Sequence, residues 1–196
     1  MGFNLKFYPP KNRLLSRLIE GFYILKKEEF DKPMSYFTFP NNYCILATNL
    51  NSTKEITTNQ IVIEPSMGFN IKSNITYHYT SPIHVKIVPP VEEITIYFKP
   101  LGIHYFIDGL KEYYNEGFIK EIDLFTDFTT AYTEIFFEKN FDTKIDLIES
   151  YWLSKYKQKH FELESKILED LEQGRAIKSI ASKYNYSRQY INKIIY

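Results

Sequence analysis

The sequence predicts an α+β fold, with a β-barrel or sandwich over roughly the first hundred residues and helices from there to the end. Short β-branched and aromatic runs alternate with clusters of Pro, Asn, Ser and Gly up to Phe98. Near Pro100 the apolar residues change to the three-and-four spacing of helices. Aromatic residues make up 17% of the chain, which is typical of a folded protein with a buried core and not of a disordered one.

Six runs in the first part are expected to be strands, because β-branched and aromatic side chains fit a pleated, half-buried surface. These runs are Phe22–Leu25, Ser35–Phe39, Tyr43–Leu46, Ile61–Ile63, His84–Val88 and Ile94–Phe98. Turn-forming clusters separate them at Pro40–Asn42, Asn49–Asn59, Pro65–Gly68 and Pro89–Pro90. Several short strands without intervening helices favour a sandwich or a small barrel.

Two helices are expected next, at Phe128–Phe137 and Ile145–Tyr156. The second carries a stripe of large apolar side chains at spacings of three and four, made of Ile145, Ile148, Tyr151 and Trp152. This stripe holds more large apolar residues than one intramolecular face needs. It therefore indicates a homodimer, although it could instead cover the end of the barrel.

The last segment has the spacing of three short helices. The apolar positions of the first are Leu163, Ile167, Leu168 and Leu171, those of the second are Ile177, Ile180, Ala181 and Tyr184, and those of the third are Ile191, Ile194 and Ile195. Gly174 is a natural left-handed C-cap after the first helix. Asn185, which tolerates positive φ, and Ser187, a good N-cap, stand between the second and third. This pattern predicts a helix-turn-helix, with Tyr186 filling the gap between its two helices.

The outward face of the third helix is expected to carry Arg188, Gln189, Asn192 and Lys193. Arg and Lys can pair with guanine edges or phosphates, and Gln and Asn with adenine, so this face suits a helix in a major groove. From Gln173 to Tyr196 the chain holds five basic residues and no acidic one, while the other 172 residues hold 19 basic and 24 acidic. That asymmetry is typical of a nucleic-acid-binding module, although a solvated helical face would also show it.

The stretch Ile177–Ile194 resembles the first helix-turn-helix of the AraC/XylS family of bacterial regulators. The resemblance rests on the small Ala181, on Tyr186-Ser187 at the turn, on Ile191 and on the basic Lys193, while Asn185 and Ile195 depart from the usual Gly and Phe. It implies double-stranded DNA as the partner, with base contacts from Gln189, Asn192 and Lys193. Ser187 and Arg188 would lie nearer the DNA backbone, and RNA polymerase is a further candidate partner.

The same resemblance implies a cupin-like sensor domain before the helices, and Phe98–Phe106 is similar to the end of such domains. We accordingly expect a cupin-like sensor or dimerisation domain at 1–107, a helical linker at 108–158 and a helix-turn-helix unit at 159–196. Family members carry a second helix-turn-helix, so we expect the unit here to be incomplete. A small-molecule effector in the first domain is a further expectation. Its aromatic residues could line a pocket or form a solid core, and they are Phe22, Tyr23, Tyr36, Phe37, Phe39, Tyr77 and Tyr79.

Enzyme classes find little support in the sequence, and we expect neither catalysis nor a cofactor. His78, His84 and His104 lack the His-x-His spacing of metal cupins, so no metal site is expected. The single Cys44 lies in an apolar run, which indicates a structural thiol in a cytoplasmic protein. No stretch has the length of a signal peptide or a membrane span. The alternative is a cupin-type binding or catalytic module whose C-terminal helices serve only packing or dimerisation.

Overall fold

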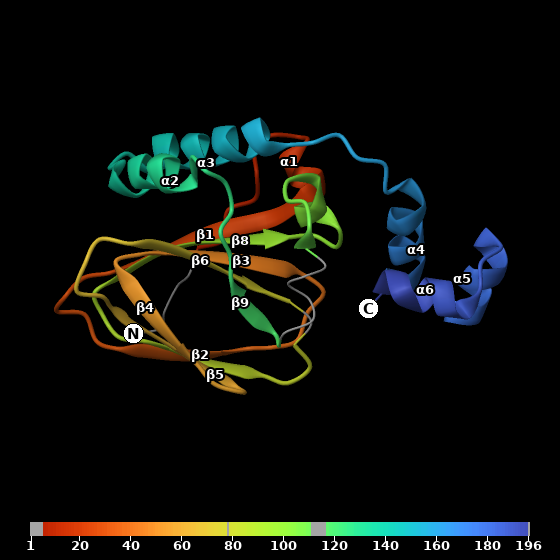
Figure 1. Cartoon of the computed structure of the whole chain (residues 1–196), viewed down its shortest axis with the longest axis horizontal. Coiled ribbons are helices and arrows are strands. Elements are labelled where there is room, and N and C mark those ends of the chain that lie inside the picture. The colour runs from red at the N-terminus through yellow and green to blue at the C-terminus, as the bar shows by residue number, and fades with distance from the viewer. Residues whose placement is uncertain (1–5, 78, 111–116, 196) are drawn as a thin grey trace. The chain divides into compact units, whose positions relative to one another are not determined.

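The computed structural model describes residues 6–77, 79–110 and 117–195, except for the side chains of residues 193–195. Within this range the chain is a mixed α+β protein that divides into two compact units, 1–157 and 158–196. Of the segment 108–158, expected as a helical linker, all but Gln158 falls in the first unit. The strands and helices of that unit are shown in Figure 1.

The first unit contains two β-sheets and the helices that cover one of them. Its elements are α1 (Leu15–Leu18), β1 (Ile19–Lys27), β2 (Met34–Thr38), β3 (Cys44–Leu50), β4 (Ser52–Ile56), β5 (Gln60–Pro65), β6 (Ile71–Thr76), β7 (Ile83–Ile87), β8 (Val91–Phe98), the 3-10 helix η1 (Gly102–Tyr105), β9 (Ile119–Glu121), α2 (Phe128–Phe137) and α3 (Phe141–Lys155). All six expected strands and both expected helices are present; α2 has the expected ends, and the others are shifted at one or both ends. The strands β4, β6 and β9 were not expected.

The two sheets have separate strand orders among the described residues. The five-stranded sheet runs β1-β8-β3-β6-β9 and pairs antiparallel throughout, with Phe22 opposite Ile96 and Ala47 opposite Thr95. The four-stranded sheet runs β2-β7-β5-β4, and its β5 and β7 are parallel. Because no described strand pairs from one sheet to the other, the structure supports two stacked sheets and does not establish the cupin-like barrel.

Alternation along the strands gives the five-stranded sheet two different faces. One face packs against α1, η1, α2 and α3, which lie above the sheet in Figure 1. The other contributes Tyr23, Leu25 and Val91 to a second core, shared with the inward side chains of β5 and β7. The four-stranded sheet thus covers the face that the helices leave free.

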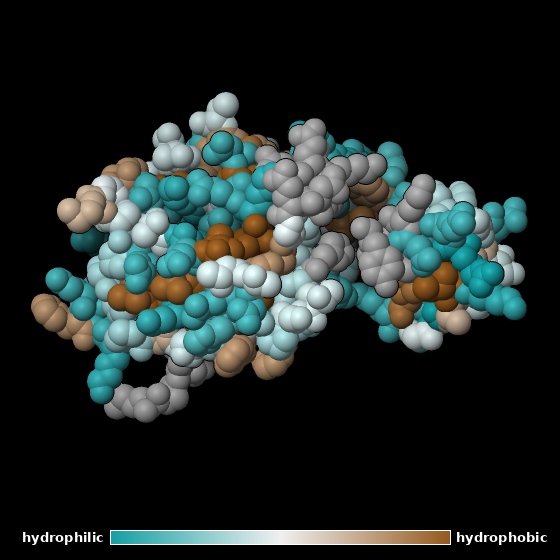
Figure 2. All heavy atoms as spheres, turned by 60° about the horizontal axis from the view of Figure 1, so that its bottom comes forward, coloured by the Kyte–Doolittle hydropathy of each residue, from teal (hydrophilic) through white to brown (hydrophobic). Residues whose placement is uncertain are grey.

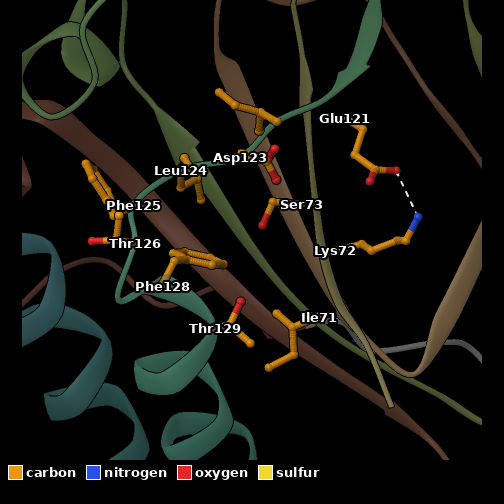
Figure 3. Close-up of a pocket in the computed structure, with 11 residues that line it drawn as sticks. Ile71, Lys72, Ser73, Glu121, Asp123, Leu124, Phe125, Thr126, Phe128 and Thr129 are labelled. Carbon is orange, nitrogen blue, oxygen red and sulfur yellow. Dashed lines mark hydrogen bonds and ion pairs between the residues drawn. The ribbon is translucent and has the colours of Figure 1, made fainter. Parts of the chain in front are cut away.

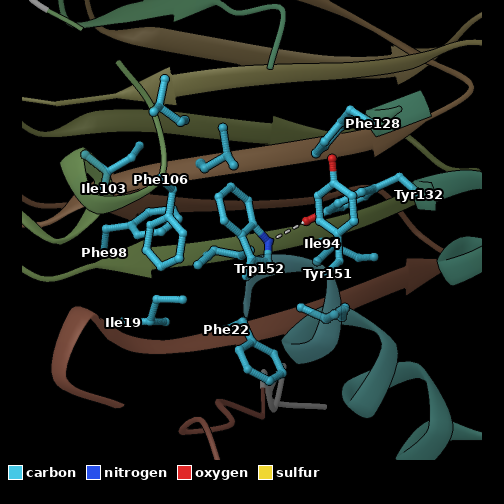
Figure 4. Packing of buried hydrophobic residues seen from close by; sticks show 14 of the residues in the cluster. Ile19, Phe22, Ile94, Phe98, Ile103, Phe106, Phe128, Tyr132, Tyr151 and Trp152 are labelled. Atoms are coloured by element: carbon cyan, nitrogen blue, oxygen red, sulfur yellow. Dashed lines mark hydrogen bonds between the residues drawn. The ribbon is translucent and has the colours of Figure 1, made fainter. Parts of the chain in front are cut away.

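Trp152 lies at the centre of the core between helices and sheet, and it is fully buried (Figure 4). Its indole packs edge-to-face on Phe98 and Phe106, with centroids 5.1 and 5.3 Å away. The indole N–H donates to the Tyr132 hydroxyl at 3.0 Å, so the polar atom of each ring has a partner inside the core. This arrangement fixes α2 and α3 against one another and on the sheet.

The stripe on α3 is buried inside the first unit. Ile145, Ile148, Tyr151 and Trp152 are all less than 9% exposed, and they belong to the core between the helices and the five-stranded sheet. The sequence-based interpretation of these residues as surplus apolar surface was therefore wrong. Because the wide face of the five-stranded sheet covers the whole stripe, these residues no longer support a homodimer.

Candidate nucleic-acid interface

The C-terminal unit is built from α4 (Glu162–Glu172), α5 (Ile177–Tyr184) and α6 (Arg188–Ile195). A small core holds the three helices together, and its buried members are Ile167, Ile180, Ala181 and Ile191. Leu163, Leu171, Ile177 and Tyr184 pack around it, whereas Leu168 is not part of it. Around these apolar residues, hydrophilic side chains cover most of the face of this unit that Figure 2 shows.

The turns of the unit follow from single residues. Gly174 adopts φ +75°, and its N–H donates to the Leu171 carbonyl after α4. Asn185 ends α5 in the left-handed conformation, with φ 59° and ψ 41°. The Ser187 hydroxyl accepts from the Tyr190 N–H at 3.1 Å, as an N-cap does. Ala181 is 6% exposed where the helices meet, so the expected helix-turn-helix geometry is present.

Tyr186 does not fill the gap between the helices. Its side chain is 42% exposed and stacks on Tyr190, with ring centroids 4.5 Å apart. Because Ile180, Ala181 and Ile191 already close the small core, the left-handed turn can direct Tyr186 outward. The two tyrosines therefore form an aromatic surface at the start of α6, which the sequence-based interpretation missed.

Four of the five expected DNA-contacting residues have described side chains, and all four are exposed. Ser187 caps α6, and Arg188, Gln189 and Asn192 are exposed on the surface of that helix. Lys193 lies in α6, but its side chain is outside the described residues, as are those of Ile194 and Ile195. In the described part of the chain, no ion pair engages Arg188.

Asp170 is an acidic residue that lies three positions before the basic segment 173–196 and was therefore not counted with it. It lies in the last turn of α4, is 4% exposed, and accepts hydrogen bonds from Lys183 Nζ at 2.8 and 3.0 Å. The Arg175 guanidinium also pairs with it. The hydrogen bond from Lys183 is the main cause that holds the pKa of the Asp170 carboxyl below its ordinary value. Two of the five basic residues after Gln173 are thus already paired.

In the first unit, a cavity of about 60 Å³ lies between the two sheets. Of the aromatic residues proposed to line a ligand pocket, Tyr23 and Tyr36 line this cavity, while Phe22 and Tyr77 pack on the helix side of the five-stranded sheet. Phe37 and Phe39 are 59% and 65% exposed, which places them in neither core. The aromatic residues are thus divided among two cores and the surface.

The cavity between the sheets also contains charge. Glu93 is 2% exposed, and its carboxylate accepts from the Tyr23 hydroxyl at 2.8 Å, from Thr95 at 2.9 Å and from Asn49 at 2.9 Å. Lys54 also lines the cavity, and no hydrogen bond or ion pair joins its ammonium to a described residue. Burial lowers the pKa of Lys54 to about 8, although nearby Glu93 partly opposes the shift.

A larger hollow of about 380 Å³ lies where the chain passes from β9 into α2 (Figure 3). Three of its polar side chains are engaged, since Lys72 pairs with Glu121 at 3.3 Å and the Ser73 hydroxyl bonds Thr48 at 2.9 Å. Phe128 and Leu124 supply apolar walls. Nothing among these side chains resembles a nucleophile with its base.

No metal site appears within the described residues, where no group of three His, Cys, Asp or Glu could hold an ion. His84 stacks on Phe37 with centroids 4.9 Å apart, and His104 lies in η1. His78 is outside the described residues. Cys44 is half-buried beside the helix-side core, and burial raises the pKa of its thiol. Among the described residues, no helix is both long and apolar enough to cross a membrane.

Comparison with known proteins adds one weak likeness. No family model matches the chain, and no curated protein matches it. Among solved structures, the chain is similar to apo ToxT from Vibrio cholerae, at 9% identity and a TM-score of 0.37. The match covers 88% of this chain and 73% of that chain. A likeness at that TM-score assigns neither a family nor a function.

Proposed function

We propose that this chain is a sequence-specific, DNA-binding transcription regulator of the AraC type, which acts in the cytoplasm and is not an enzyme. The observation that carries the proposal is the α5-turn-α6 unit, with Arg188, Gln189 and Asn192 exposed on one helix. A helix with such side chains fits a major groove, because the two amides can form paired hydrogen bonds with base edges while the guanidinium binds a phosphate.

Selection from a pool of random duplex DNA tests this proposal. We expect the full chain to enrich a defined sequence, and an Ala181→Leu variant to enrich none. Ala181 is 6% exposed between the helices, where a larger side chain cannot fit without separating them. Thermal melts would show that the first unit of the variant stays folded. A pool that gains no consensus with the wild-type chain would contradict the proposal.

The effector belongs to the same proposal, and we assign it to the cavity between the two sheets. Charged groups inside a cavity, such as the buried Glu93 and the half-buried Lys54, contribute little to a core and are typical of recognition sites. A volume of about 60 Å³ holds only a few heavy atoms. An effector of sugar size would therefore require the sheets to move apart.

The alternative function is a cupin-type binding or catalytic module whose C-terminal helices only pack or dimerise. It predicts that the chain enriches no DNA sequence in the selection above. The formation of a homodimer and the binding of RNA polymerase stay predictions. Light scattering tests the first, and a binding assay with the polymerase tests the second.

A further inference from the structure

The Asp170 carboxylate is held by two cations, one from the loop after α4 and one from the last turn of α5. One carboxylate oxygen lies 2.8 Å and the other 3.0 Å from Lys183 Nζ, and the Arg175 guanidinium bonds one of them. The backbone N–H of Arg175 also donates to the Asp170 carbonyl at 3.0 Å. These bonds join the end of α4 to the loop that follows it and to the last turn of α5.

The position of Asp170 explains why it needs both partners. The C-terminal end of a helix carries partial negative charge, so an acidic side chain in the last turn of α4 is unfavourable there. Burial adds to the cost, because a carboxylate removed from water must be paired. Lys183 and Arg175 provide that pairing, while their own side chains remain about half exposed.

We propose that Asp170 withdraws Arg175 and Lys183 from DNA contact, so that the phosphate contacts of the described residues rest on Lys178 and Arg188. This inference depends on the proposed function, and it assigns a face of the unit to the DNA backbone. Lys178 and Arg188 are exposed, and neither forms an ion pair with a described residue. A cation whose charge an internal carboxylate already neutralises displaces few counterions when DNA approaches.

A pair of matched lysine variants tests the assignment, with the full chain and a short duplex of mixed sequence. Lys178→Gln and Lys183→Gln remove the same charge from opposite ends of α5. We expect Lys178→Gln to reduce the slope of log affinity against log salt by about 0.9. Lys183→Gln should leave the slope unchanged. Equal losses from the two variants would overturn the inference.

A pair of matched acid variants tests it in the other direction. Asp170→Asn removes one negative charge from beside two cations and should steepen the slope by about 0.9, which makes the affinity fall roughly three- to fourfold more between 50 and 200 mM salt. Glu169→Gln changes the net charge equally, but Glu169 is exposed and pairs with no described residue. It should leave the slope close to that of the wild type. The inference would be contradicted if the two variants showed the same slope of log affinity against log salt.

Elution from heparin separates the failure of this inference from the failure of the proposed function. Heparin is a polyanion without base sequence, and the order expected on it is Lys178→Gln first, Lys183→Gln with the wild type and Asp170→Asn last. If the chain selects no DNA sequence but its variants keep this elution order, only the proposed regulator function is contradicted. If the chain selects a DNA sequence but its variants lose this elution order, only the proposed role of Asp170 is contradicted. Circular dichroism melts exclude unfolding, and Lys183→Gln keeps the test valid if Asp170→Asn does not fold.

Discussion

Asp170, Lys54 and Asn185 show at the residue scale which features a local pattern can predict. Asn185 takes φ 59°, and its identity between two apolar periods was enough to predict the turn. Asp170 and Lys54 acquire their properties only from packing, since their surroundings come from other elements. A window from Gln173 to the end therefore appeared purely basic, although the acid that pairs with two of its cations lies only three residues upstream.

Lys54 gives a prediction for stability against pH. Its pKa in the folded chain, about 8, is below the ordinary 10.5, so the unfolded chain binds more protons between these values. The free energy of unfolding should therefore rise as pH increases from about 8 toward 10.5, and the cost of the buried ammonium should be fully present below 8. Lys54→Met should raise the stability at pH 7 by on the order of 1–3 kcal/mol.

Urea titrations at pH 7, 8 and 9 measure this effect. The exposed Lys86, on the strand β7, is the control, because Lys86→Met should change neither the stability nor its pH dependence appreciably. A Lys54→Met chain that is less stable than the wild type at pH 7 would show that Lys54 has a stabilising partner.

At the scale of elements, the sequence predicted the strands that are rich in residues of high β-propensity. It missed the strands that form only because they pair with residues distant in the sequence. The strands β1, β7 and β8 are rich in β-branched and aromatic residues, and they were expected. The strand β4 reads Ser-Thr-Lys-Glu-Ile, a polar run interpreted as a turn, and only its pairing with β5 makes it a strand. In β6, Asn74 and Thr76 are buried although polar, because they lie on the five-stranded sheet.

The junction of α1 with η1 depends on a single glycine. A Cβ added to Gly102 would lie 2.1 Å from the Leu18 carbonyl oxygen and 3.0 Å from its carbon. Because both are backbone atoms, Gly102→Ala must push α1 away from η1, and we expect it to destabilise the chain by about 1–3 kcal/mol. Gly68→Ala is the matched control, since a Cβ there meets nothing within 4 Å. Thermal melts of the two variants compare them directly, and equal melting temperatures would show that the junction relaxes without cost.

At the scale of the whole molecule, the chain combines a unit of two sheets and helices with a small three-helix unit. The α+β class and the helix-turn-helix were predictable, because both depend on apolar period and turn residues. The cupin-like barrel and the dimer were not established, because sheet closure and surface apolar area depend on packing that periodicity does not determine. Burial of the α3 stripe against the five-stranded sheet is the clearest example.

The central claim is that α6 reads base edges, and Gln189 tests it most directly. Against single-base variants of the duplex obtained by selection, Gln189→Ala should relax the preference at one or two positions, at a cost of roughly 1–3 kcal/mol for the preferred base. Arg188→Ala should weaken binding about equally on every duplex, because a phosphate contact carries no base information. Gln173→Ala, which removes an equally exposed glutamine from the turn after α4, should change neither. An unchanged base preference for Gln189→Ala would contradict the claim that this helix reads the groove.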